Sequence, residues 1–158
     1  MLALFQKKEP PRPSTLRQLP LFATLSRGEL SVVDVLLHER RYLKGEIIFD
    51  EGEEGQALYV VISGRVLICR QGEPEAGRII DIDEGVVFGE LALLDNVPRA
   101  RQARAAEDSV LASLSRGDFE SLLDTHAVIA SKIALQLARQ LGRQLREQSS
   151  GMSEPRSL

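Results

Sequence analysis

The sequence predicts an α+β fold in which a barrel or sandwich of short strands lies between helical segments. From about residue 40 to residue 114, short runs rich in β-branched residues alternate with glycines, a pattern typical of such all-β units. On either side, a serine with capping spacing precedes apolar residues at helical intervals. The 158 residues, of which 43% are hydrophobic, suffice for one domain with a single core.

The first helix is predicted near residues 27–38. Ser26-Arg27-Gly28-Glu29 has the spacing of a capping box. Apolar residues follow at helical intervals, at Leu30, Val33, Leu36 and Leu37. Residues 1–14 end in a proline-rich stretch and are predicted to be a flexible leader or linker.

Seven runs in the middle of the chain are predicted strands. They are Glu46–Phe49, Leu58–Ile62, Val66–Cys69, Arg78–Ile82, Val86–Phe88, Arg101–Ala106 and Ser109–Leu114. Most of the breaks between them contain a glycine, which favours turns. These glycines are Gly45, Gly52, Gly55, Gly64, Gly72, Gly77 and Gly85.

Helical spacing returns at Ser115-Arg116-Gly117-Asp118, which predicts a short helix through Leu123 and a long one from about His126 to about Gln148. Small residues followed by leucines share one side of the long helix, which suits close contact with a second helix and hence a homodimer. Alternatively, this side only covers the strands. The residues are Ala130, Ala134, Leu137, Leu141 and Leu145. Residues 149–158 are polar and are expected to form a disordered tail.

Composition argues against several function classes. A net charge of −3 gives no reason to expect a nucleic-acid partner, and no apolar run is long enough for a membrane span or a signal peptide. Cys69 is the single cysteine, so an intramolecular disulfide is impossible and a cytoplasmic location is favoured. His38 and His126 lie far apart, and no metal site is expected. No P-loop, nucleophile elbow or histidine–cysteine cluster indicates an enzyme.

The stretch from Phe88 to Ala100 is the most informative part of the chain. Gly89 lets the backbone approach a ligand closely, and residues 90–94 favour a helical turn whose first N–H groups can face an anion. Pro98 fixes the backbone before Arg99, whose guanidinium can bind phosphate in a bidentate way. Glu90 suits a hydroxyl donor such as a ribose 2′-OH. The alternative for Glu90 and Arg99 is a plain surface ion pair.

The segment FGELALLDNVPRA resembles the phosphate-binding cassette of the cyclic nucleotide-binding domain family. That family includes regulatory subunits of cyclic-AMP-dependent protein kinase, cyclic-nucleotide-gated channels and the bacterial catabolite activator protein. The resemblance runs from about Leu16 to about Gln148. It includes Leu19-Pro20-Leu21-Phe22, Leu25-Ser26, Gly45-Glu46-Ile47-Ile48, Glu51-Gly52, Gly55, Tyr59-Val60 and Ile62-Ser63-Gly64.

This resemblance implies an eight-stranded antiparallel β-roll, also called a double-stranded β-helix or jelly roll, with N-terminal helices and a long C-terminal helix. The implied domain covers residues 15–148, with the roll at about 40–114 and the C-terminal helices at about 118–148. It needs no cofactor, and the implied ligand is cyclic AMP, with cyclic GMP as the alternative.

The resemblance also implies a role for each residue of the site. Gly89 and the backbone of Glu90, Leu91 and Ala92 would meet the cyclic phosphate, and Arg99 would neutralise its charge. Glu90 would accept from the ribose hydroxyl, and Ala100 would add a backbone contact. Phe88 and Pro98 complete the predicted site. Aligned on the catabolite activator protein, Gln144 takes the place of a residue that contacts the adenine amino group, although a solvated helix position is the alternative.

Three neighbours of Arg99 bear on selectivity and affinity. Ala100 resembles the cyclic-AMP type, since cyclic-GMP-preferring kinases tend to carry threonine there. Arg101 and Gln102 depart from the family, which usually has a small residue and then a hydrophobic residue or threonine. Arg101 either points inward, where it would crowd the pocket or add a second phosphate contact, or points to solvent from a slightly shifted strand.

The predicted function is a stand-alone cyclic nucleotide-binding module that signals to an unidentified protein partner through movement of its C-terminal helix. Only about ten residues follow that helix, too few for the helix-turn-helix that catabolite activator relatives append. The alternative is a degenerate β-roll that acts by dimerisation and binds nucleotide weakly or not at all, which Arg101 would favour.

Overall fold

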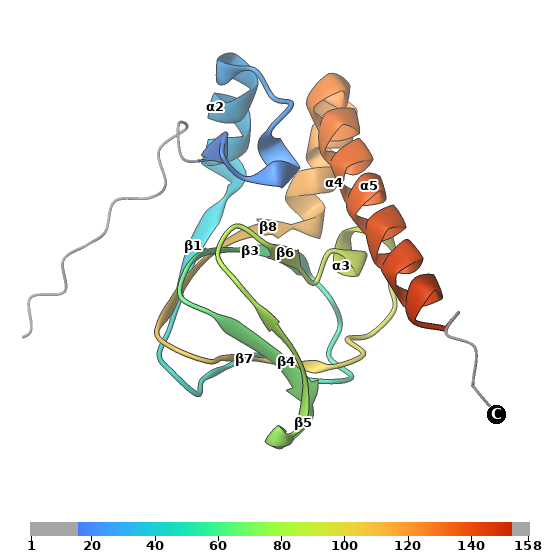
Figure 1. The fold of residues 1–158 in the computed structure, drawn as a ribbon. Helices are drawn as coiled ribbons and strands as arrows, with labels where there is room; N and C mark the ends of the chain where they lie inside the picture. Colours follow the sequence, from blue (N-terminus) through green and yellow to red (C-terminus); the bar gives the residue numbers. More distant parts are fainter. Residues whose placement is uncertain (1–15, 153–158) are drawn as a thin grey trace, which may run out of the picture.

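The computed structural model describes residues 16–152 and consists of two four-stranded antiparallel sheets with helices at one end. The strand orders are β1-β8-β3-β6 and β2-β7-β4-β5. Figure 1 shows α2 and α4 above the strands, whereas α5 begins there and runs down past α3 beside them. This arrangement confirms the predicted α+β fold with an eight-stranded β-roll. The predicted leader, residues 1–14, lies outside the described residues, as do residues 153–158.

The seven predicted strands are all present in the predicted order, and one further strand, β1, precedes them. The strands are β1 (His38–Tyr42), β2 (Ile47–Phe49), β3 (Ala57–Ser63), β4 (Val66–Arg70), β5 (Glu73–Ile82), β6 (Val87–Phe88), β7 (Gln102–Ala105) and β8 (Ser109–Ser115). The helices are η1 (Pro20–Phe22, a 3-10 helix), α2 (Arg27–Leu36), α3 (Leu91–Leu94), α4 (Arg116–Thr125) and α5 (Ala127–Met152).

Both predicted serine caps are confirmed. The Ser26 hydroxyl accepts from the backbone N–H of Glu29, and the Glu29 carboxylate accepts from that of Ser26. The Ser115 hydroxyl accepts from the N–H of Asp118 in the same way. These bonds satisfy N–H groups that the first turn of a helix leaves without an intrahelical partner.

The first helix ends at Leu36, so its predicted extension to residue 38 was wrong. His38 instead begins β1, which pairs with β8 over five residues from His38–Ser113 to Tyr42–Ser109. The sequence HERRY lacks an apolar alternation, and β1 lies at the edge of its sheet. It becomes a strand because β8 supplies hydrogen-bond partners from far along the chain, which local pattern does not reveal.

Strand β5 is longer than its predicted core, Arg78–Ile82, and includes Gly77. A Cβ at Gly77 would lie 2.7 Å from Cβ of Glu73, so no other residue fits without displacement. The pairing of β4 with β5 shifts register at Cys69, beside this position. The glycine therefore marks an irregularity within the strand rather than a break between strands.

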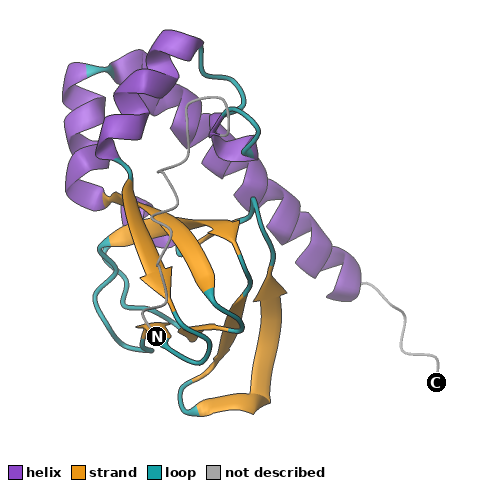
Figure 2. Ribbon diagram, turned by 90° about the vertical axis from the view of Figure 1, so that its left-hand side faces the viewer, coloured by secondary structure: helices purple, strands orange, loops and turns teal. Residues whose placement is uncertain are grey.

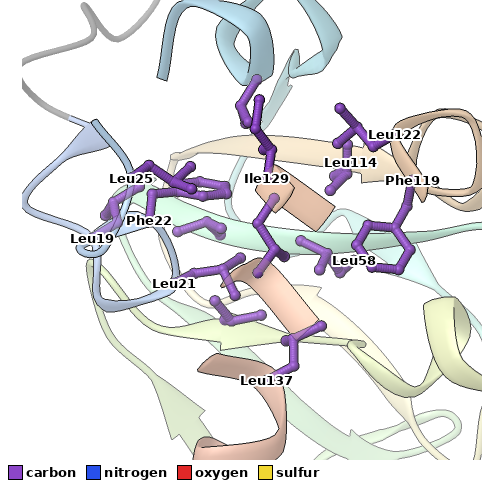
Figure 3. Close-up of a cluster of buried hydrophobic side chains, with 14 of the residues drawn as sticks. Leu19, Leu21, Phe22, Leu25, Leu58, Leu114, Phe119, Leu122, Ile129 and Leu137 are labelled. Carbon is purple, nitrogen blue, oxygen red and sulfur yellow. The ribbon is translucent and has the colours of Figure 1, made fainter. Parts of the chain in front are cut away.

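Two separate hydrophobic clusters lie on opposite faces of the sheet β1-β8-β3-β6. Val61 and Leu111 face the second sheet and pack with apolar residues of its strands. Val60 and Leu114 face the helices instead. Figure 3 shows part of this helix-side cluster, in which Leu58 and Leu114 lie with side chains from η1, α4 and α5.

The first half of α5 belongs to the helix-side core. Ala130, Ile133 and Leu137 are completely buried there, whereas Leu145 is 65% exposed. The prediction that Ala130 and Leu137 contact a second molecule was therefore wrong, because this domain already covers them. Ala134 packs partly buried against the same cluster, and Leu141 is half-buried.

Helix α5 also continues beyond its predicted end at Gln148 to Met152, so the start of the predicted disordered tail is helical. Figure 2 shows its second half projecting along the side of the strands, away from the other helices. No helix in residues 16–152 has the length and apolar character needed to cross a membrane.

Candidate ligand-binding site

A pocket of about 690 Å³ opens between the β-roll, the segment around α3 and the second half of α5. Its size is typical of small-molecule sites. All nine residues predicted from the sequence line it: Phe88, Gly89, Glu90, Leu91, Ala92, Pro98, Arg99, Ala100 and Gln144. The fold thus brings one residue of the C-terminal helix to two neighbouring segments of the roll.

Gly89 connects β6 to α3 in a conformation that other residues rarely adopt. Its φ is +69°, and a Cβ there would lie 2.7 Å from Nη1 of Arg99. The same nitrogen donates a hydrogen bond of 3.0 Å to the Gly89 carbonyl. The backbone turn therefore requires a glycine, and the missing Cβ also leaves room for the arginine nitrogen.

Arg99 is held by backbone and aromatic groups. Its Nη2 donates to the Ala57 carbonyl at 2.7 Å, and its Cζ lies 4.1 Å from the centroid of the Phe49 ring. The backbone of Arg99 is fixed as well, since its N–H donates to the carbonyl of Glu53 at 2.8 Å. Burial lowers the pKa of the guanidinium, although nearby Glu53 and Glu90 oppose that shift. An arginine remains charged in such surroundings.

Glu90 is 8% exposed and lines the pocket without forming an ion pair with Arg99. The alternative of a surface ion pair was therefore wrong for these two residues. Burial raises the pKa of the Glu90 carboxyl, against smaller opposing effects from its own backbone N–H and from Arg99. The site thus contains a partly buried cation, Arg99, and a buried acceptor, Glu90, that do not form an ion pair with each other.

Helix α3 begins at Leu91, one residue after the start of the helical turn predicted over residues 90–94. Its first internal hydrogen bonds run from Ala92 N to Gly89 O, at 3.3 Å, and from Leu93 N to Glu90 O, at 3.1 Å. The N–H of Leu91 lies ahead of these bonds, as expected where a helix starts. Ala92 packs closely on the loop before β3, because a Cβ on Gly55 would lie 2.7 Å from Cβ of Ala92.

An apolar wall faces this polar corner, and it was not predicted from the sequence. It comes from β4, β5 and the start of β6: Ile68, Ile79, Ile80, Ile82 and Val87. Ile79 and Ile80 are about half exposed, at 49% and 53%. The available signal was this adjacent pair of isoleucines, because strict alternation in a half-buried strand would bury only one of them.

The aromatic support of Arg99 was also missed. Phe49, Tyr59 and Phe88 pack together, with the rings of Tyr59 and Phe88 stacked at 5.3 Å between centroids. Phe49 and Tyr59 come from β2 and β3, far from the cassette in sequence. Their spacing gives no local signal, because only the pairing of the sheets brings them behind the arginine.

The second half of α5 contributes three polar side chains to the pocket: Gln144, Glu147 and Gln148. The last two were not predicted, although they follow Gln144 by one helical turn and therefore share its side of the helix. Gln140, one turn earlier, donates a 3.4 Å hydrogen bond to the Val87 carbonyl of the roll. Leu141 and Gly142 are partly buried, and residues 143–150 are exposed.

Arg101 and Gln102, the two departures from the family pattern, do not fill the pocket. Arg101 is among the residues that line the pocket but is exposed, and its Nη1 donates to the carbonyl of Ala100 at 3.0 Å. Gln102 is buried within β7, where its carbonyl oxygen accepts from Nε of Arg104 at 2.7 Å and its amide donates to Asp50. Among residues 16–152, no cluster of His, Cys, Asp or Glu side chains is arranged to hold a metal ion.

Comparison with known proteins gives consistent matches. The family model for the cyclic nucleotide-binding domain matches residues 39–126. Cyclic AMP receptor protein of Thermus thermophilus is 37% identical over 116 residues, which are 73% of this chain and 54% of that protein. The cAMP-dependent protein kinase regulatory subunit of Hypocrea atroviridis is 31% identical over 108 residues, 68% of this chain and 22% of that protein.

Among solved structures, that of Thermus thermophilus Catabolite Activator Protein has a TM-score of 0.72 and 34% identity. The match covers 84% of this chain and 61% of that one. The chain spans between 22% and 54% of the length of the two curated relatives. On the match of the family model over more than half of its length, this chain belongs to the cyclic nucleotide-binding domain family.

Proposed function

We propose that this chain is a regulatory module that binds cyclic AMP in the pocket between the β-roll and α5. The observation that carries the proposal is the convergence of Gly89, Glu90, Arg99 and Gln144 on one cavity of about 690 Å³. The names of the two curated relatives both refer to cyclic AMP. Each part of such a ligand has a chemical counterpart in the pocket.

The cyclic phosphate fits the corner formed by Arg99 and the start of α3. A guanidinium has five N–H donors, and Arg99 uses two of them on the carbonyls of Gly89 and Ala57. Three therefore remain for phosphate oxygens, beside the backbone N–H groups at the start of the helix. Stacking on Phe49 and partial burial hold the charge in place and strengthen its interaction with an anion.

The ribose and the base fit the remaining surfaces. The buried Glu90 carboxylate can accept a hydrogen bond from the ribose 2′-hydroxyl, and the isoleucine wall of β4 and β5 offers apolar contact to a base. Gln144 reaches the pocket from α5 and can donate to and accept from an adenine edge. Ala100 presents no hydroxyl next to Arg99, which favours cyclic AMP over cyclic GMP.

Signalling would use α5, because its two halves are held very differently. Residues up to Leu137 are fixed in the helix-side core, whereas those beyond it touch the roll mainly around the pocket. A ligand that contacts Gln144 therefore favours one position of the second half over others. Coupling of this kind requires only that the ligand interacts differently with the two positions.

We also propose that two copies of the chain associate through the second half of α5. Of the five residues predicted for this contact, Leu145 is 65% exposed and Leu141 is half-buried, so both retain surface for a partner helix. Both lie next to the pocket-lining residues of the same helix. Ligand binding and association would then depend on the same segment.

Calorimetric titration with cyclic AMP, cyclic GMP and cyclic di-GMP tests the ligand assignment. We expect cyclic AMP to bind most tightly and to raise the melting temperature. Ligand at 100 times its dissociation constant adds about 2.7 kcal/mol to the free energy of unfolding. A melting curve that none of the three ligands shifts would support the alternative of a roll without useful nucleotide binding.

Arg99→Ala should abolish useful binding of cyclic AMP. Removing one partner of a desolvated charge pair costs about 3–5 kcal/mol, which is about two to four decades in the dissociation constant. The matched control is Arg139→Ala, an exposed arginine of α5 that does not line the pocket. Equal affinities for Arg99→Ala and Arg139→Ala in the same titration would contradict the proposed phosphate site.

A further inference from the structure

Arg116, the first residue of α4, makes more polar contacts than its position at a helix start requires. Its Nε donates to the Ala92 carbonyl at 2.7 Å, and its Nη2 donates at 2.8 Å to the carbonyls of both Gly55 and Asp95. Its Nη1 also donates to the side-chain oxygen of Asn96. One side chain thus binds four acceptors, none of which belongs to its own helix.

These acceptors all come from the segments that build the proposed phosphate site. Ala92 lies in α3, Asp95 and Asn96 follow directly after it, and Gly55 lies in the loop before β3. Ala92 and Gly55 also touch each other, since a Cβ on Gly55 would clash with the Ala92 side chain at 2.7 Å. Arg116 therefore binds the carbonyl of Ala92, a residue that itself lines the pocket.

The two arginines are also electrostatically related. A Cβ on Gly55 would lie 3.5 Å from Cζ of Arg99, while the Gly55 carbonyl accepts from Arg116. The nearby positive charge of Arg116 contributes to lowering the pKa of Arg99. An anion bound to Arg99 would offset this repulsion, so occupancy of the pocket and the contacts of Arg116 favour each other.

Helix α4 is in turn packed against α5. Phe119 and Leu122 of α4 share the helix-side core with Ile129 and Leu137 of α5, as Figure 3 shows. A displacement of α4 therefore carries the first half of α5 with it. Leu93 of α3 enters the same core and is the other route by which α3 can act on the helices.

We propose that Arg116 is a positioning residue that ties α4 to the turn of α3, so that ligand binding at Gly89–Ala92 is transmitted to α4 and α5. This inference rests on the proposed nucleotide site for its trigger, but the tie itself exists without ligand. Arginine suits the role because its planar, branched donors reach several carbonyls at once, whereas lysine offers a single ammonium group.

Hydrogen exchange measured by mass spectrometry on the full chain tests the tie without ligand. Arg116→Met keeps an unbranched apolar side chain and removes all donors. We expect faster exchange in residues 91–96 and 116–125, by about tenfold or more, as the loss of hydrogen bonds to a charged group implies. Arg139→Met on the exposed side of α5 is the matched control. Unchanged exchange in both segments would overturn the tie.

Addition of cyclic AMP then tests transmission. In the wild-type chain we expect slower exchange both around residues 89–95 and in residues 127–148. In Arg116→Met, cyclic AMP should still slow exchange around residues 89–95, but its effect on residues 127–148 should be several-fold smaller. Arg116→Lys should give an intermediate effect on residues 127–148. An undiminished effect in α5 would overturn the inference and assign the coupling to Leu93.

Two further outcomes are distinguishable. If cyclic AMP does not change exchange in the wild-type chain, the proposed function is wrong, and so is the proposed coupling. The comparison without ligand still tests whether Arg116 ties α4 to α3. If Arg116→Met does not fold, Asn96→Ala removes one acceptor and should show the same changes at smaller size. Unaltered exchange in Asn96→Ala would then count against the inference.

Discussion

Gly55 and Gly89 both lie where a side chain would collide with groups of the proposed phosphate site. Gly89 needs its positive φ as well as space beside Arg99. Gly55 has no such backbone requirement, and only its distance from Ala92 excludes a Cβ. Glycine is therefore needed at position 89 for its backbone conformation, whereas at position 55 it is needed only because a side chain would not fit.

Gly55→Ala should lower both stability and affinity for cyclic AMP. The added methyl group displaces Ala92, and overpacking of this kind costs about 1–3 kcal/mol. Urea unfolding and calorimetry measure the two effects. Gly28→Ala in α2 is the control, because nothing lies within 4 Å of its added Cβ and helix propensity favours alanine. Equal stability of the Gly55→Ala and wild-type chains would show that the turn yields without cost.

The raised pKa of Glu90 predicts that the free energy of unfolding and the affinity for cyclic AMP change with pH in opposite directions. Burial raises its pKa in the folded chain, so the fold disfavours the ionised form. Without ligand, the free energy of unfolding should therefore rise as pH falls through the folded pKa, and level off below the unfolded value. Affinity for cyclic AMP should fall over the same range, because protonation weakens the acceptor for the ribose hydroxyl.

Glu90→Gln is the matched variant for both measurements. It keeps the size of the side chain and removes its titration, so both pH dependences should flatten. The comparison requires unfolding experiments and calorimetric titrations over a pH range that runs from the unfolded pKa of the carboxyl, through its folded pKa, up to neutral pH. A wild-type and a Glu90→Gln chain with the same pH profile of affinity would exclude the carboxylate as the group responsible.

Residues adjacent in sequence were predictable, whereas those assembled by the sheets were not. The run from Phe88 to Ala100 carries its own chemistry, so glycine, carboxylate, proline and arginine could be assigned to a pocket that the structure contains. Phe49 and Tyr59 reach Arg99 only through strand pairing, and Arg116 reaches Ala92 across 24 residues. No local pattern announces such contacts.

At the scale of elements, caps and turns determined what could be predicted. The capping serines located α2 and α4, because each requires only residues three positions apart. Strand β1 escaped prediction because its partner β8 lies about 70 residues later. The apolar side of α5 was ambiguous for a similar reason, since a stripe of leucines suits a neighbouring sheet and a second helix equally.

Leu137→Ala tests where α5 is anchored. Its side chain is completely buried in the helix-side core, and removing such a leucine costs about 2–5 kcal/mol. Leu135→Ala, two residues earlier and 50% exposed, should change stability by less than about 0.5 kcal/mol. Chemical denaturation of both variants makes the comparison. Similar losses of stability in the two variants would contradict the burial of the first half of α5 in the helix-side core.

For the whole molecule, the remaining question of assembly concerns the second half of α5. Light scattering should give the mass of a dimer for the wild-type chain and of a monomer for Leu145→Glu, which places a charge on the exposed contact. Leu135→Glu controls for the added charge on the same helix. A wild-type chain that is monomeric, or a Leu145→Glu chain that remains dimeric, would refute this contact.

The sheet β1-β8-β3-β6 divides the interior, so consecutive valines lie in different surroundings. Val60 contacts the helix-side cluster and Val61 the cluster between the sheets, and both are completely buried. Their methyl resonances would report independently on the two compartments. A nucleotide titration followed by NMR would thus locate an internal rearrangement from two neighbouring positions, without any engineered probe.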